Sequence, residues 1–425
     1  INDIALTRQY EFINASITEN IQGDKIDFEI NITESEKFYI EKININGNFA
    51  TLEEVIRNNL IIDEGDPFNE ILFNKSINDI QSLGIFKKVR TDIKKGSSEE
   101  FKEIDLNIVE RPTGEISLTA GFGTDGETIG GGVRENNFLG KGIKLDTNLE
   151  ITADSIKGKF IYAKPNFNYT DNTLFTSIKS STSDFLTDSG YKTSEIGFSL
   201  GTKFEQFQNV YLRPEIDFLI EDLETSSKAS STLKKQEGSY TDLYFNYSIN
   251  QDLRDKKYNT ESGYVTNFAQ ELPIISDNAE LSNAFEVTKF KKLSTRSNMV
   301  GKVSFYGKTI TGLNDDVRIS KRLNIPSFRL RGFEKGKIGP IENNDYIGGN
   351  HISTLNLSAT LPNVFEGLDN LDVGVFVDAA NVWGVDYDST IDDNSKIRSS
   401  TGVALNLMTP VSYTHLTLPT NDVGG

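Results

Sequence analysis

The sequence predicts a small α+β domain followed by a large antiparallel β-barrel that crosses a membrane. At 425 residues the chain is too long for one ordinary domain. Roughly the first hundred residues mix helical and strand patterns. From Glu115 onward the helical period disappears, and apolar residues alternate with polar ones in segment after segment.

Composition excludes several classes of function. The formal net charge is −18, which argues against a nucleic-acid partner because phosphate binding draws most of its affinity from Lys and Arg. The absence of cysteine excludes disulfides, Cys-based metal sites and Cys nucleophiles. No run of about 18 apolar residues occurs, so no transmembrane helix is expected. The weaker signal of a membrane β-strand would not appear in that test.

Two helices are predicted in the first domain. Thr51 precedes a helical pattern with Glu54 three residues on, which is a capping box. Asp66 and Pro67 open a second helix in the same way, and Gly84 is expected at its C-terminal cap.

Strands are predicted on both sides of these helices. The stretch 26–32 alternates apolar and polar residues and reads as a half-buried strand. The segment FYIEKININGN precedes the helices, and strands near 86–93 and 101–110 follow them. The predicted order is β-α-α-β-β, and an ordinary α+β domain with no special role remains open.

The second region contains about fourteen alternating segments up to Met408. In the segment from Ile143 to Ile151, odd-numbered residues are mostly apolar and even-numbered ones, such as Lys144, are polar. Many segments approach the ~9–11 residues that a membrane strand needs, rather than the ~5–6 of soluble strands. A lipid-facing Lys costs ~2–4 kcal/mol at mid-membrane, so Lys144 is expected in a wet lumen. A large soluble β-sandwich remains the alternative.

The stretch FRLRGFEKGKIGP, from Phe328 to Pro340, lies in the longest segment without strand character. A loop folded into the barrel would deliver Arg331 to Asp378, which alternation places on the lumenal face of the strand around 371–383. Ser358 is expected on the lumenal face of the strand before it. A buried guanidinium requires a carboxylate and further acceptors. A solvated surface loop with an ordinary arginine remains the alternative.

Several stretches together carry a family resemblance. Leu330, Arg331, Gly332 and Phe333 are similar to the [V/L]RGF motif of the BamA family of outer-membrane assembly factors, in which POTRA domains precede a bacterial surface antigen barrel. FYIEKININGN, LGIFKKVRTDI, DLRDKKYNTESGY and VDAANVW resemble further segments of that family in the same order. Asn259 departs from the usual Pro, and Ser358 stands where the family often has a glutamate facing the loop arginine.

The resemblance implies a domain order. The barrel has sixteen strands in the family, against about fourteen here, so the last strands are expected to be missing. Residues 411–425 resemble a translated sequencing adapter and are expected to be a non-native tail. The expected parts are the end of a preceding POTRA domain at 1–36, a complete POTRA domain at 37–111 and an outer-membrane barrel at 112–410.

The resemblance also implies a function without catalysis. The chain is expected to assemble and insert outer-membrane barrel proteins, with the POTRA domains in the periplasm. Its expected partners are unfolded outer-membrane proteins, accessory lipoproteins and the lipid bilayer. No enzyme activity, cofactor or metal is expected. A polypeptide transporter of the two-partner secretion type, in the same superfamily, is the alternative.

Four sets of residues are assigned by this resemblance. They are the loop motif Leu330, Arg331, Gly332 and Phe333; its lumenal partners Asp378 and Ser358; a lateral-seam strand with Ile116, Leu118, Ala120 and Phe122; and a POTRA sheet edge with Ile43 and Ile45.

Overall fold

The fold is described here from a computed structural model of the chain. The described residues are 13–22, 25–34, 38–123, 126–187, 189–256, 260–294, 298–334, 336–342, 345–361, 371–386, 395–408 and 413–420. Within these, the side chains of 13–17, 21–22, 25, 32–34, 122–123, 126, 169, 406–408 and 413–420 are not described.

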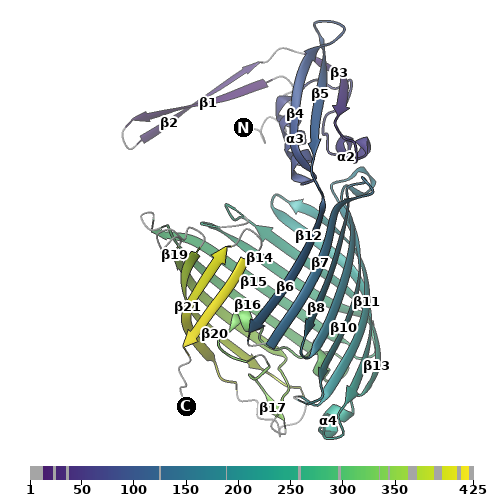
Figure 1. Cartoon of the computed structure of the whole chain (residues 1–425), viewed down its shortest axis with the longest axis vertical. Helices are drawn as coiled ribbons and strands as arrows, with labels where there is room; N and C mark the ends of the chain where they lie inside the picture. The colour runs from purple at the N-terminus through teal and green to yellow at the C-terminus, as the bar shows by residue number, and fades with distance from the viewer. Residues whose placement is uncertain are drawn as a thin grey trace. The chain divides into compact units, whose positions relative to one another are not determined.

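The predicted β-α-α-β-β order of the first domain is confirmed. Its sheet has the order β3-β5-β4, with β3 parallel to β5 and β4 antiparallel to it (Figure 1). Both helices contribute to one apolar core, in which Ile56, Ile80 and Leu106 are fully buried. The elements are β3 (Tyr39–Asn46), α2 (Glu53–Arg57), α3 (Glu70–Ser82), β4 (Phe86–Lys95) and β5 (Phe101–Glu110).

Both predicted helix starts are wrong in detail. Helix α2 begins after Leu52 and has no side-chain cap. The N–H of Thr51, which the Glu54 side chain would accept in a capping box, donates to Glu110 Oε1 at 2.7 Å instead. Helix α3 begins after Asn69, whose side chain accepts from two backbone N–H groups. Gly84, at φ +71°, follows the end of α3 as predicted. No helix among the described residues is long and apolar enough to span a membrane.

The predicted strand at 26–32 lies in a two-stranded hairpin of β1 (Ile13–Gln22) and β2 (Lys25–Glu34). The prediction that it is half-buried is wrong, since Ile26, Phe28 and Ile30 are all exposed. A hairpin of two strands has no second layer of its own against which to bury these side chains.

The second region forms one antiparallel sheet that curls into an open barrel (Figure 1). From β6 to β21 it has the fourteen strands that the alternation predicts, and each pairs with the next, including β16 with β19 across the long loop that joins them. The strands are β6 (Gly114–Gly123), β7 (Gly126–Phe138), β8 (Ile143–Thr152), β9 (Ser155–Lys164), β10 (Thr173–Phe185), β11 (Tyr191–Phe207), β12 (Val210–Thr225), β13 (Gly238–Asp252), β14 (Gly263–Ser276), β15 (Glu280–Ser294), β16 (Met299–Gly312), β19 (His351–Leu361), β20 (Leu371–Trp383) and β21 (Arg398–Met408).

A further strand, β22 (Tyr413–Thr420), pairs with β21 through its backbone. It lies within the predicted non-native tail, and its side chains are outside the described residues.

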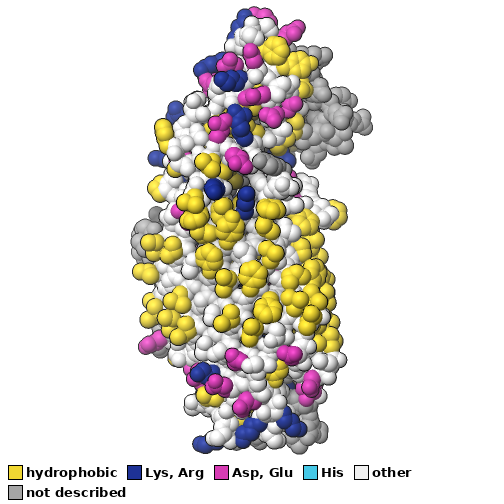
Figure 2. Space-filling view, turned by 90° about the vertical axis from the view of Figure 1, so that its right-hand side faces the viewer, with side chains coloured by type: hydrophobic (Ala, Val, Ile, Leu, Met, Phe, Trp, Pro, Cys, Tyr) yellow, Lys and Arg dark blue, Asp and Glu magenta, His cyan; other side chains and the backbone are white. Residues whose placement is uncertain are grey.

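The sheet is apolar outside and polar inside. On β11, Ile196 is 63% exposed, whereas the lumenal carboxylates Asp242 and Asp378 are 0% exposed. Figure 2 shows hydrophobic side chains in a broad band over the outer face, with charged side chains gathered at its lower end. A soluble sandwich would have the reverse distribution. The alternative of a soluble sandwich is therefore wrong, and the sheet is a membrane barrel.

Candidate functional site

The loop between β16 and β19 packs into the barrel rather than over its surface. It contains η2 (Ile319–Lys321), η3 (Ser327–Arg329), β17 (Ile341–Glu342) and β18 (Asp345–Tyr346). Its apolar side chains form a core with β16, β19 and β20, in which Leu330 is 1% exposed and Phe333 packs at the margin. Gly332 has φ +86°, a conformation that glycine adopts without strain.

Arg331 lies against Asp378 in the middle of β20. Its Nε donates to Asp378 Oδ2 at 2.7 Å and its Nη2 donates to Oδ1 at 2.8 Å. The backbone N–H of Arg331 donates to Oδ2 at 3.2 Å, and the guanidinium lies 3.5 Å from the ring centroid of Phe376. Such a bidentate, charge-assisted pair fixes both the position and the orientation of the loop.

Asn356 supplies the remaining contacts of this anchor. It lies opposite Asp378 in the ladder, and its side-chain amide donates to Asp378 Oδ1 at 2.8 Å and to the carbonyl of Arg329 at 2.7 Å. Ser358, the second predicted partner, lies opposite Phe376, two residues further along β19. Among the described residues, no hydrogen bond joins Ser358 to Arg331, so Asn356 takes the position expected of Ser358.

The neighbouring Arg329 makes a second contact with the wall. Its Nη2 lies 3.0 Å from Glu286 on β15, and its guanidinium lies 3.9 Å from the ring centroid of Tyr306 on β16. Arg329 and Arg331 therefore hold two different parts of the wall, β15 with β16 and β19 with β20.

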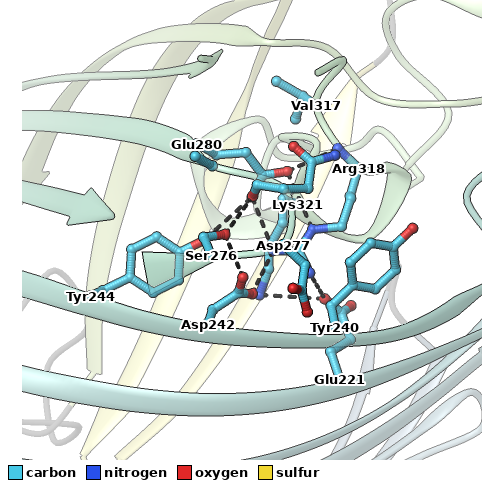
Figure 3. A network of polar contacts seen from close by, with 12 residues as sticks. Glu221, Tyr240, Asp242, Tyr244, Ser276, Asp277, Glu280, Val317, Arg318 and Lys321 are labelled. Carbon is cyan, nitrogen blue, oxygen red and sulfur yellow. Dashed lines mark hydrogen bonds and ion pairs between the residues drawn. The ribbon is translucent and has the colours of Figure 1, made fainter. Parts of the chain in front are cut away.

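The most deeply buried cation of the loop is Arg318, which the sequence analysis does not single out. Its side chain is 0% exposed and contacts carboxylates on three strands (Figure 3). Nη1 lies 3.1 Å from Glu221 on β12, and Nη2 lies 2.6 Å from Asp242 on β13 and 3.2 Å from Glu280 on β15. Its backbone N–H also donates to Glu280, and its guanidinium covers the ring of Tyr240.

The charges of this Arg318 cluster nearly balance. Lys321, 3.7 Å from Glu221 and 3.5 Å from Glu195, adds a second cation to the three carboxylates around Arg318. Burial lowers the pKa of Arg318, but the carboxylates, Glu280 first, raise it above its ordinary value. Arg318 thus stays charged. Within the described residues, no group of His, Asp or Glu side chains is arranged to hold a metal ion.

The alternation of apolar and polar residues could have predicted two of the carboxylates in this cluster. Glu221 follows the lipid-facing Ile220, and Asp242 precedes Leu243, so both carboxylates are placed in the lumen by period two. No local sequence pattern indicates which cation of the loop contacts these carboxylates.

The sequence of the barrel region also matches a known family. The family model described as the Omp85 superfamily domain matches residues 137–418. The chain belongs to the Omp85 superfamily. The POTRA family model, described as a surface antigen variable number repeat, matches residues 38–111.

Curated relatives carry the name "Outer membrane protein assembly factor BamA". One from Neorickettsia risticii is 22% identical, covering 90% of this chain and 52% of the relative. Another from Neisseria meningitidis serogroup B is 25% identical, covering 97% of this chain and 55% of the relative. The chain therefore spans about half the length of the curated relatives it matches.

Solved structures share the fold. The crystal structure of BamA from Haemophilus ducreyi lacking POTRA domains 1–3 has a TM-score of 0.76 at 20% identity, with 98% of this chain and 88% of that chain covered. CdiB from Escherichia coli has a TM-score of 0.61 at 15% identity, with 98% and 78% covered. The predicted fold, an α+β POTRA domain followed by an antiparallel barrel, is confirmed.

The predicted seam strand is β6, at one edge of the Omp85 sheet. Ile116 is 80% exposed and Leu118 is 87% exposed, and Ala120 is exposed on the same face. The side chain of Phe122 lies outside the described residues. Ser117 lies beside the lumenal Asn148 at Gly132, so the three apolar side chains, which alternate with it, point out of the barrel.

The predicted POTRA edge is β3, at the side of its sheet. The side chain of Ile43 is 1% exposed, and Ile45 packs against the same core, so a partner strand would have to pair through the backbone. At Ile43 that backbone is already bound. Its N–H donates to Glu64 Oε1 at 3.0 Å, and its carbonyl accepts from Arg57 Nη2 at 3.0 Å.

Removing these two side chains is expected to open the edge. In Arg57→Ala with Glu64→Ala, the amide of Ile43 should exchange with deuterium at least tenfold faster, because each lost hydrogen bond is worth ~1.5–3 kcal/mol when charged. Lys95→Ala, which breaks an exposed pair with Glu99, is the control. Unchanged exchange at Ile43 would mean that other groups protect this edge.

Proposed function

We propose that this chain assembles and inserts β-barrel proteins in the bacterial outer membrane, with its POTRA domain in the periplasm. Unfolded outer-membrane proteins are the clients, and accessory lipoproteins are further partners. No cofactor or catalysis takes part. The observation that carries the proposal is the agreement of nearly the whole chain with relatives named as outer membrane protein assembly factors.

Insertion is proposed to occur at β6. An open strand edge in lipid leaves backbone groups without hydrogen-bond partners, and an incoming strand satisfies them. Strand lengths support this position. Strands β6, β8 and β9 have 10 residues each and β7 has 13, whereas β11 and β12 have 17 and 16. A shorter wall favours a locally thinner bilayer, which lowers the cost of passing polar backbone through it.

The contacts of the loop support a barrel whose wall is held on one side and not at β6. Arg318, Lys321, Arg329 and Arg331 contact side chains on β11, β12, β13, β15, β16 and β20. The loop thus holds strands between β11 and β20, and β6 lies at the far edge of the sheet from β20. Opening at β6 leaves these pairs intact.

A disulfide across the seam tests the proposal. In the full-length natural protein, one cysteine replaces Ser117 on β6 and another is placed on the strand that meets it; the present chain contributes no other cysteine. Cells that depend on this protein should stop growing when the bond is oxidised and recover with reductant.

A matched control places the bond inside the wall. Thr288 and Ser304 lie opposite each other on β15 and β16, with hydroxyl oxygens 2.7 Å apart. Cysteines at these positions should permit growth whether oxidised or reduced. Normal growth with the seam locked would refute insertion through β6.

The second candidate is a two-partner secretion transporter, since that group also has POTRA domains and an RGF-type loop. It would export one polypeptide partner. A locked seam would leave such export unaffected, so the same cysteine variants separate the two functions.

A further inference from the structure

Two lysines break the rule that charged side chains of the barrel face the lumen. On β15 the even-numbered Glu286 and Thr288 face inward, where they contact Arg329 and Ser304. Lys289 and Lys291 therefore point outward with Phe285, and both are exposed. Among the described residues, neither lysine has an ion pair or a hydrogen bond. A lipid-facing charge is costly at the bilayer centre and tolerated near the headgroups.

The lysines lie near the end of the barrel wall. Lys291 and Lys289 are three and five residues before Ser294, where β15 ends, and the next strand, β16, begins at Met299. In the orientation proposed above, this is the periplasmic end. Lysine stems lie along apolar surface while their ammonium groups reach the headgroups.

A hollow of about 600 Å³ opens beside the two lysines on the outer face. Its base is a row of small residues, because Lys291 pairs with Gly301, and Gly301 pairs with Ala359. The adjacent row, Val303, Leu357 and Val377, is apolar and exposed. Leu293 lies over Gly301 at one end. The hollow thus joins an apolar trough across β15, β16, β19 and β20 to the two exposed lysines.

We propose that this hollow binds an anionic phospholipid of the adjacent leaflet, with one acyl chain in the trough and the headgroup phosphate between Lys289 and Lys291. The acyl chain leaves one apolar environment for another, so the trough contributes shape and the lysines contribute selectivity. Basic side chains next to membrane-embedded grooves favour anionic headgroups in this way. The site lies on the wall reinforced by the loop, away from β6.

Lipid binding to the purified chain tests the proposal. Detergent-solubilised protein is titrated with phosphatidylglycerol or phosphatidylcholine, and bound lipid is counted by native mass spectrometry. The unmodified chain should prefer phosphatidylglycerol. Lys289→Gln with Lys291→Gln should lower that affinity about thirtyfold, the effect expected of two lysines near a membrane surface.

Two further variants separate charge from shape. Ala359→Phe fills the trough and should abolish phosphatidylglycerol binding although both lysines remain. Lys157→Gln with Lys159→Gln is the control, because it removes the same charge from the lumenal face of β9. Ile156 and Phe160 point outward on that strand, so the two lysines face the lumen, and lipid binding should be unchanged. A gel-mobility shift on heating confirms that each variant is folded.

Three results would overturn the proposal. These are equal affinity for the two lipids, unchanged binding in the Lys289 and Lys291 variant, and equal losses in both lysine pairs. A negative result in the seam experiment would not bear on this proposal, because lipid binding is measured in the absence of client proteins.

Discussion

Arg318→Met is expected to destabilise the barrel by ~3–5 kcal/mol, because it leaves buried carboxylates without their cation. Glu221, Asp242 and Glu280 are each at most 2% exposed, and all three lie within 3.2 Å of the guanidinium. Urea unfolding of the chain in lipid vesicles measures the loss. Protease cleavage between β16 and β19 should increase in parallel, since the loop loses its deepest anchor.

Neutralising the carboxylates should reverse the effect. Adding Asp242→Asn and Glu280→Gln to Arg318→Met is expected to restore most of the lost stability. The control is Arg213→Met, whose partner Glu215 and own side chain are partly exposed, and which should cost less than ~1 kcal/mol. Equal losses in the two arginine variants would contradict the buried-charge explanation.

Arg331→Ala and Asp378→Ala are each expected to free the tip of the loop, and their losses should not add. The pair shares two side-chain hydrogen bonds and one from the backbone, so the double variant should be more stable than the sum of the single losses predicts by at least ~1.5 kcal/mol. Urea unfolding and deuterium exchange over residues 328–334 measure this coupling.

A second cycle on the same strand provides the control. Asp372 lies six residues before Asp378 on β20, roughly 20 Å away along the strand. Arg331→Ala and Asp372→Ala should give additive losses. Additive losses in the cycle with Asp378 would mean that the loop is held by its apolar core around Leu330 and not by the ion pair.

The two anchors differ in how far the sequence predicts them. Asp378 follows from alternation along a single strand, and Arg331 from a glycine-spaced motif, so each half of that pair has a local signature. The partners of Arg318 are 97, 76 and 38 residues away. They meet only because β12, β13 and β15 are brought close in the sheet with a particular stagger.

By itself the sequence determined the order of the two domains, the number of strands from β6 to β21 and the face on which each side chain lies. These are properties of short segments, because the period of two is built into the extended backbone. Only the tertiary structure decided that Arg318 is the deepest anchor, that Asn356 replaces Ser358 beside Asp378, and that Glu64 and Arg57 occupy the edge of β3. Each of these contacts depends on strand register and on the path of a loop, which long-range packing sets and no local pattern encodes.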